Sequence, residues 1–341
     1  MTGFLIATLL PVPLLVLAAT MPGDWALLAF AYLTLFTAIL DHILPKSWRN
    51  QDAAQEFRSG HGLSVALGVI HLFLVIIAVR YIGGPGGVSG WDTLPAILAY
   101  GIYFGQVSHP NAHELIHRSG REARQLGRLV YSTMLFGHHA SAHPKVHHVF
   151  VATEMDPNTA QLGEGFYHFF RKAWIGSFRE GLRVETRDLR RAGRGWLHHP
   201  YVGYVAVGLG MMALAWLLAG PEGLGVLLAI SGFAQVQILL SDYVQHYGLE
   251  RGIRPDGKPE PVGPQHSWNS PHRVTSAMML HAPRHSDHHI HPDRIYPGLQ
   301  LDREAMPMLP RSLPVMAVVA LFPPLWRRVM NRQLLPWQRD F

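Results

Sequence analysis

The sequence predicts an all-α integral-membrane protein with about six transmembrane helices and a helical cytoplasmic cap that carries a histidine-rich metal site. Of its 341 residues, 48% are hydrophobic and only 15% are charged, whereas about 25% are charged in an average soluble domain. Several apolar stretches approach the roughly 20 residues that a helix needs to cross the hydrocarbon core of a bilayer. The remaining segments show helical rather than strand periodicity. A large soluble helical protein is the alternative, but near-continuous apolar runs flanked by Pro and Gly disfavour it.

Six apolar stretches are the predicted spans. No Lys or Arg precedes Lys46, so the first stretch lacks the positive segment of a signal peptide, and we expect it to remain as a helix. The predicted cap comprises residues 113–199 and 246–341, which makes the whole chain, residues 1–341, a single integral-membrane domain. The predicted spans are residues 3–20, 25–44, 60–82, 94–108, 201–220 and 224–243.

The distribution of basic residues predicts how the chain is oriented. Residues 118–195 carry thirteen Lys and Arg against seven Asp and Glu, whereas the turns at 21–24 and 83–92 carry no Lys or Arg. The positive-inside rule therefore places residues 118–195 and both termini in the cytoplasm. The net charge is +6. The basic residues lie next to the predicted spans, where attraction to anionic membrane lipid or to an acidic partner accounts for them. No nucleic-acid-binding motif is visible.

Histidine carries the predicted metal chemistry. The chain has no cysteine, which excludes disulfides, thiolate zinc sites and iron–sulfur clusters on this chain. Three clusters, HELIH, HPKVHH and HSDHH, repeat the spacing of i and i+4 that places two side chains on one helical face. Their eight histidines exceed the four ligands of one tetrahedral zinc and suit two metal ions. The clusters contain His113 and His117; His143, His147 and His148; and His285, His288 and His289.

Several readings of these clusters stay open on the residues alone. Imidazole suits iron, copper and zinc alike, so the ligands do not name the metal. HELIH matches the motif of zinc metalloproteases, in which Glu114 would be the general base, but that reading leaves the other two clusters unexplained. A bis-histidine haem electron carrier is a further alternative. Each cluster lies at the cytoplasmic end of a predicted span or in the predicted cap, which favours a lipophilic substrate.

The ordered segments HELIHR, HPKVHH, QHYGLER, HSWNSPH and RHSDHHIHP resemble the bacterial alkane 1-monooxygenases of the fatty-acid desaturase-like superfamily. This resemblance implies a non-haem di-iron enzyme of the bacterial inner membrane, with its metal site and both termini cytoplasmic. It would hydroxylate the terminal carbon of an alkane, with dioxygen as co-substrate and electrons from a rubredoxin-type donor fed by a reductase. No nucleotide or haem is expected on this chain. The implied iron ligands are His113, His117, His143, His147, His148, His246, His285, His288 and His289.

The resemblance has alternatives and departures. The same scaffold could serve a lipid or fatty-acyl desaturase or an aromatic-methyl hydroxylase, and a membrane zinc metalloprotease is a remote possibility. Where the family commonly has other residues, this chain has Ala142, Pro144 and Lys145 in the second cluster and Gln245 before His246. Ligating imidazoles usually donate their second N–H to a carboxylate or carbonyl. The residues we expect to support the ligands in this way are Glu114, Asp156, Asp242, His266, His272 and Asp287.

Overall fold

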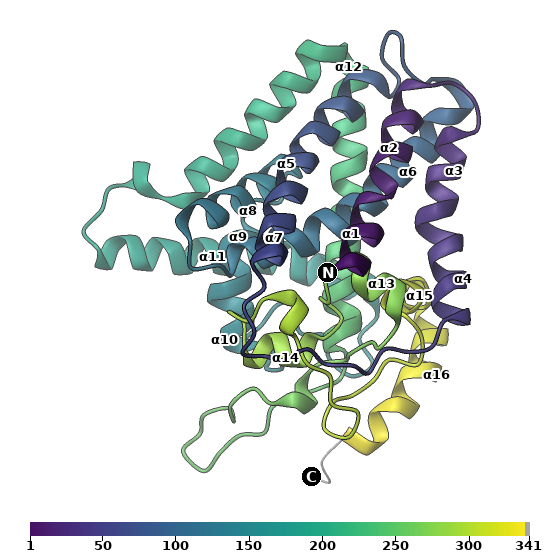
Figure 1. Ribbon diagram of the computed structural model, residues 1–341. Coiled ribbons are helices and arrows are strands. Elements are labelled where there is room, and N and C mark those ends of the chain that lie inside the picture. The colour runs from purple at the N-terminus through teal and green to yellow at the C-terminus, as the bar shows by residue number, and fades with distance from the viewer. Residues whose placement is uncertain (338–341) are drawn as a thin grey trace.

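The computed structural model describes residues 1–337 as an all-helical protein, in agreement with the predicted fold class. Within those residues the only β-type pairing consists of two isolated bridges, Ile253 with Pro259 and Asn269 with Met308. Figure 1 shows long helices at one end of the molecule and shorter helices and loops at the other. The first residues of the chain lie near this second end, beside α13.

Four helices are long and apolar enough to cross a membrane by length and composition: Thr2–Thr20, Trp25–Ile43, Arg58–Tyr81 and Pro200–His246. The first joins α1 (Thr2–Leu9) to α2 (Pro11–Thr20) through a helical Leu10. The second comprises α3 (Trp25–Ala31), the π-turn η1 (Tyr32–Phe36) and α4 (Thr37–Ile43), and the third is α5 (Arg58–Tyr81). These helices agree with the predicted spans 3–20, 25–44 and 60–82.

The fourth of these helices, α12 (Pro200–His246), contains two predicted spans, 201–220 and 224–243. Its backbone is non-helical at Ala219 and Gly220, and Gly220 has a φ of +62°. Only glycine adopts that conformation at little cost, and the Pro221 that follows has no N–H to donate to the preceding turn. The helix therefore bends into two arms, which meet at the top of Figure 1.

The predicted span 94–108 lies in a helix that is not among these four. It runs through α6 (Thr93–Tyr103), the π-turn η3 (Phe104–Ser108) and α7 (His109–Ile116). Pro110 lacks an N–H and cannot donate the usual hydrogen bond to the residue four positions earlier. Just before it, the N–H of His109 donates to the carbonyl of Phe104, five residues earlier, which is the hydrogen bond of a π-turn. The count of six spans therefore stays a prediction.

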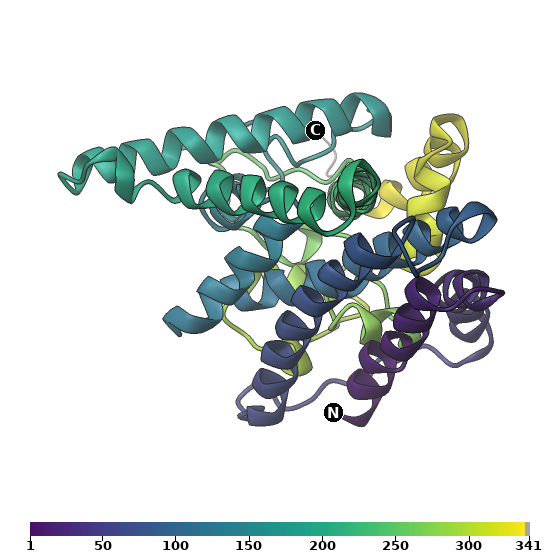
Figure 2. The same ribbon diagram turned by 90° about the horizontal axis from the view of Figure 1, so that it is seen from above.

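Short helices form the other end of the molecule. Residues 313–326, which are interrupted by prolines, fold as two short helices, neither of which is among the four candidate spans. On one flank, α11 and α12 form a hairpin (Figure 2). The elements are α8 (Arg121–Thr133), α9 (His139–Ala142), η4 (His143–His147), α10 (His148–Phe150), α11 (Phe166–Arg191), α13 (Arg273–Met278), α14 (His285–Ile290), α15 (Leu313–Ala320) and α16 (Pro323–Leu334), with 3-10 turns at Gly90–Asp92, Trp196–His198, Pro264–His266, Tyr296–Gly298 and Leu335–Trp337.

Buried polar contacts join the short helices to the long ones. Asp41, buried near the end of α4, accepts hydrogen bonds from the backbone N–H groups of Val274 (2.6 Å) and Thr275 (3.1 Å) at the start of α13. These are donors that a helix leaves unpaired at its N-terminus, and a carboxylate there is favourable. This contact joins segments more than 230 residues apart and ties the short helix α13 to the end of α4.

Candidate metal centre

Nine histidines gather in two groups among α7, η4, α10, α14 and the end of α12. Within each group, the ring nitrogens available to a metal lie within 4.8 Å of one another. The groups adjoin, because the ring centroids of His148 and His289, one from each group, are 4.5 Å apart. These nine histidines are the ones that the family resemblance selected. Group one holds His113, His117, His143, His148 and His288, and group two holds His147, His246, His285 and His289.

Group one draws its imidazoles from α7, η4, α10 and α14. The Nε2 atom of His143 lies 2.7 Å from Nε2 of His113 and 3.0 Å from Nε2 of His148. Nε2 of His288 is likewise 3.0 Å from Nε2 of His148. The ring of His117 is 5.0 Å from that of His113, and its Nε2 has no hydrogen-bond partner among residues 1–337. Five imidazoles thus converge on one small volume.

Group two is built around the last residue of α12, His246, which is fully buried. Nε2 of His285 lies 3.0 Å from Nε2 of His246 and 3.1 Å from Nε2 of His289. The ring of His147 completes the group, with centroids 4.7 Å from His246 and 4.9 Å from His289. Its Nε2 also lacks a hydrogen-bond partner in the described part of the chain.

Two local features distribute the histidines between the groups. On α14, His285 and His289 are four residues apart and share a face, whereas His288 turns toward group one. In η4 the backbone N–H of His148 donates to the carbonyl of His143, which is the i to i+5 pattern of a π-turn. This turn places His143 and His148 in group one and His147 in group two. π-turns occur often at functional sites.

The spacing and the protonation state of the imidazoles suit metal ions. Ring nitrogens bound about 2.1 Å from one ion at right angles would be roughly 3.0 Å apart, against about 3.4 Å in a tetrahedron. The shortest Nε2–Nε2 separations, 2.7–3.1 Å, agree with nitrogens that share one ion. Burial and neighbouring imidazoles hold the pKa of His143, His288 and His289 well below the usual value. They are therefore neutral, as metal ligation requires.

Asp156 is the carboxylate that contacts a candidate ligand directly. Its Oδ2 lies 2.8 Å from Nδ1 of His147, and both side chains are buried. Burial opposes the charged form of His147, but Asp156 raises the pKa of this imidazole above its usual value. The carboxylate also accepts from the hydroxyl of Thr159 at 2.7 Å and the backbone N–H of Asn158 at 3.0 Å. Such a contact fixes the tautomer with Nδ1–H outward and leaves Nε2 free for a metal.

Asp242 lies one step further from the same imidazole. It accepts a hydrogen bond from Nδ2 of Asn158 at 2.7 Å, and the backbone of Asn158 in turn contacts Asp156. Both acids that sequence analysis selected here therefore belong to one buried network behind His147.

The other four expected supporting residues make different contacts. Glu114 accepts from Arg118 and from the backbone N–H of Tyr296, so it is not poised as a protease base. Asp287 accepts from Arg294 and from the backbone N–H of Gln300. Nε2 of His266 lies 3.1 Å from Oε1 of Glu260, and the backbone of His266 contacts the imidazole of His246. His272 contacts the hydroxyl of Ser270 at 2.9 Å and lines a separate cavity.

The segments HYGL (residues 246–249) and HSWNS (residues 266–270) connect the two groups to each other. Apart from His246, no residue of these segments belongs to a group. Trp268 donates from its indole to the carbonyl of Tyr247 at 2.9 Å, next to His246. Asn269, fully buried, accepts from the backbone N–H of Ser286 at 3.0 Å and donates to the hydroxyl of Ser286 at 2.7 Å. One segment thereby joins the end of α12 to α14.

The departures from the family pattern also have structural roles. Lys145 forms ion pairs with Glu185 at 2.8 Å and Asp188 at 2.9 Å, which tie η4 to α11. Gln245 donates to the carbonyl of Ala282 at 3.2 Å, just before α14. An ionised glutamate could not donate this bond.

Two buried histidines near group one were not among the selected site residues. His109 pairs with the hydroxyl of Tyr131 at 3.0 Å, and the ring of His139 stacks on His143 with centroids 5.0 Å apart. Each precedes a candidate ligand, His113 or His143, by four residues. That extension of the i, i+4 spacing could have been read from the sequence.

An apolar cavity of about 450 Å³ lies between the long helices and α15. Residues of η1, α4, η3, α12 and α15 line it, and Thr275 and Met279 of the α13 region contribute to the same lining. Its apolar lining suits a hydrocarbon chain.

Comparisons with known proteins identify the same family that the histidine-containing segments resemble. The family model for fatty acid desaturases matches residues 89–319. The chain is 30% identical over 314 residues to alkane 1-monooxygenase 2 of Alcanivorax borkumensis, covering 90% of this chain and 82% of that protein. It is 33% identical over 274 residues to an alkane 1-monooxygenase of Pseudomonas putida, covering 79% of this chain and 66% of that one. The hydroxylase component of a xylene/toluene monooxygenase from P. putida is 28% identical over 313 residues, covering 89% and 81%. The chain belongs to the fatty acid desaturase family of non-haem iron oxygenases, within its alkane 1-monooxygenase branch.

Proposed function

We propose that this chain hydroxylates the terminal carbon of an alkane, using dioxygen and two iron ions held by the nine histidines of groups one and two. The observation that carries the proposal is the division of nine imidazoles into neighbouring sets of five and four. The relatives named alkane 1-monooxygenase support the substrate class and the reaction. In the balanced reaction, one oxygen atom enters the C–H bond and the other leaves as water, with two electrons and two protons consumed.

Bound iron would supply the activation of dioxygen and the oxidising power to break an unactivated C–H bond. The chain's own residues hold the ions and exclude water. Burial keeps most of the imidazoles neutral, and Asp156 orients His147 toward group two. The apolar cavity beside Thr275 offers a space among the long helices in which a hydrocarbon could lie without contacting water.

Electrons come from a separate protein in this proposal. With no cysteine, the chain carries no iron–sulfur centre. A rubredoxin-type donor, reduced by its own reductase, would supply the two electrons. Exposed arginines on α11, such as Arg183 and Arg187, belong to the basic 118–195 region and would steer an acidic donor.

The proposed location is the bacterial inner membrane, with both termini and the histidine groups on the cytoplasmic side. Long apolar helices support a membrane protein. The excess of basic residues in 118–195 supports the orientation.

Two alternative reactions on the same scaffold are each supported by one of the comparisons. The similarity to a xylene/toluene monooxygenase component makes an aromatic-methyl group an alternative substrate, and the desaturase family model makes alkene formation an alternative outcome.

A reconstitution experiment tests the proposal. Purified protein loaded with iron would receive a rubredoxin, its reductase, NADH and ¹⁸O₂, with n-alkanes, a fatty-acyl lipid and xylene as separate substrates. We expect a terminal alcohol carrying one ¹⁸O atom from the alkane, and no product when iron or donor is omitted. An alkene from the lipid without labelled alcohol would establish the desaturase reading, and exclusive reaction of xylene would establish the aromatic one.

A further inference from the structure

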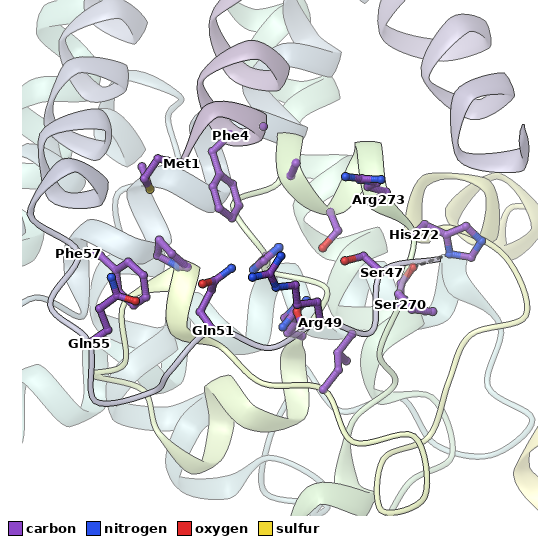
Figure 3. Close-up of a pocket in the computed structure, with 18 of the residues that line it drawn as sticks. Met1, Phe4, Ser47, Arg49, Gln51, Gln55, Phe57, Ser270, His272 and Arg273 are labelled. Atoms are coloured by element: carbon purple, nitrogen blue, oxygen red, sulfur yellow. Dashed lines mark hydrogen bonds between the residues drawn. The ribbon is translucent and has the colours of Figure 1, made fainter. Parts of the chain in front are cut away.

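A second cavity, of about 440 Å³, opens beside the first residues of the chain, and none of the nine histidines of the two groups lines it. Figure 3 shows Arg49, Gln51, Ser47 and Ser270 gathered below Phe4 of α1. Unlike the apolar cavity between the long helices, its lining is largely polar and basic. It therefore suits a different kind of molecule from a hydrocarbon.

The cavity holds an unusual concentration of positive charge. Arg284, Arg49 and Arg273 line it, whereas Glu56 is its only carboxylate. Glu56 is exposed and pairs with Arg58 outside the cavity lining. None of the three lining arginines forms an ion pair within residues 1–337. The cavity therefore presents uncompensated positive charge, which an anion would neutralise.

Arg284 is the strongest single indication of a ligand. Its side chain is 2% exposed, and it donates to the carbonyls of Leu299 and Arg49 and to Oδ1 of Asn50. Its Nε–H has no partner in the described part of the chain. Its guanidinium is charged at neutral pH. A buried cation that forms no ion pair is costly; the field of nearby Asp287 offsets part of that cost, and an anion in the cavity would offset more.

The position of the cavity indicates where that anion comes from. Three candidate spans end around it: α1 starts at Thr2 and contributes Phe4, α5 starts at Arg58 and is preceded by Phe57, and α4 ends four residues before Ser47. The ends of membrane helices lie at the level of lipid headgroups. The aromatic rings of Phe4 and Phe57 suit the glycerol and upper acyl region, while the arginines suit a phosphate.

We propose that this cavity binds the headgroup phosphate of an anionic membrane phospholipid, with Arg284 beneath it and Arg49 and Arg273 at its exposed side. The hydroxyls of Ser47 and Ser270 offer additional donors. The lipid would link α1, the 44–57 segment and α13, because all three contribute to the lining. This role does not depend on the reaction at the histidine groups.

The test measures lipid affinity of the purified full chain by native mass spectrometry, with phosphatidylglycerol and phosphatidylcholine as probes. We expect tighter binding of phosphatidylglycerol. Removing each arginine that contacts a headgroup should weaken this binding about fivefold, so the Arg49→Ala/Arg273→Ala variant should lose about 25-fold. The double lysine variant keeps both charges and should retain most of the affinity. The matched control is Arg328→Ala, an exposed arginine of α16 outside the cavity, which should bind as the unmodified protein does.

Three results would overturn the proposal. Equal binding of both lipids, or unchanged phosphatidylglycerol affinity in the double alanine variant, would remove the cavity as the site. Thermal unfolding provides the second arm, because bound ligand raises the unfolding temperature. If inorganic phosphate stabilised the protein as much as phosphatidylglycerol does, a soluble phosphate compound and not a lipid would be the ligand.

Discussion

Nδ1 of His147 lies 2.8 Å from Oδ2 of Asp156, nine residues further along the chain, with both groups buried. Asp156 in turn receives hydrogen bonds from Thr159 and Asn158. The orientation of one candidate ligand is therefore set by a carboxylate that belongs to neither histidine group.

Asp156→Ala should weaken metal binding in group two. Losing an outer hydrogen bond of this kind typically costs about 10- to 100-fold in metal affinity or activity, because the imidazole can then rotate and change tautomer. The measurement is iron content against free iron concentration, together with activity at saturating iron. Asp256→Asn changes an exposed carboxylate and serves as the control. Unchanged iron affinity in Asp156→Ala would show that His147 is not held for a metal.

His246→Ala should remove iron from group two while sparing group one. It leaves His147, His285 and His289, and it opens a cavity at a fully buried position. We expect iron per chain to fall from about two toward about one, with loss of hydroxylation. His168→Ala, an exposed histidine paired with Glu164, should keep both irons. An active His246→Ala protein with full iron occupancy would refute the ligand role.

Asn269→Ala should act on the site through α14. The change leaves the backbone N–H of Ser286 without its acceptor and empties a fully buried position. Each unsatisfied buried polar group costs about 1–3 kcal/mol, so the unfolding temperature should fall by several degrees. Iron should be lost even though Asn269 is not a ligand, and Asn269→Asp, which cannot donate to Ser286, should not restore it. Gln333→Ala, at an exposed position of α16, is the control.

The sequence was most informative where spacing along one helix decides which side chains meet. The i, i+4 pairs His113/His117 and His285/His289 each share a group. It was less informative about the acids beside them. Glu114 follows His113 directly and Asp287 precedes His288, and adjacent residues on a helix face different directions. That is why they contact Arg118 and Arg294, respectively, and not an imidazole.

Other features depend on backbone geometry that residue patterns do not specify. The division of HPKVHH between two groups follows from the π-turn at His143. The resemblance supplied His246, but only the fold brings it to His285. The kink at Gly220 agrees with the predicted boundary between two spans, because Gly-Pro is a strong turn signal. The π-turn before Pro110 was not foreseen, since proline also occurs inside regular helices of membrane proteins.

Gly248→Ala should destabilise the cap. Gly248, in HYGL, has a φ of +70°, and an added Cβ would lie 2.6 Å from Cδ1 of Leu334. The backbone strain is about 1 kcal/mol, and the clash adds to it. Gly257 has a similar φ of +76° with nothing within 4 Å, so Gly257→Ala isolates the strain. Thermal unfolding should show a larger loss for Gly248→Ala. Equal losses would indicate that Leu334 moves aside freely.

The last prediction concerns orientation, for which the chain is well suited because it contains no native cysteine. A cysteine replacing exposed Ser119 should react with a membrane-impermeant maleimide only after cells are opened, because basic residues hold 118–195 inside. A cysteine replacing exposed Ser89, in the loop that follows the C-terminal end of α5, should react in intact spheroplasts. The two sites control for each other, since intact spheroplasts should label only the Ser89 position, whereas opened cells should label both. Labelling of Ser119→Cys in intact spheroplasts would place the histidine groups on the outer side, where a cytoplasmic rubredoxin could not reach them.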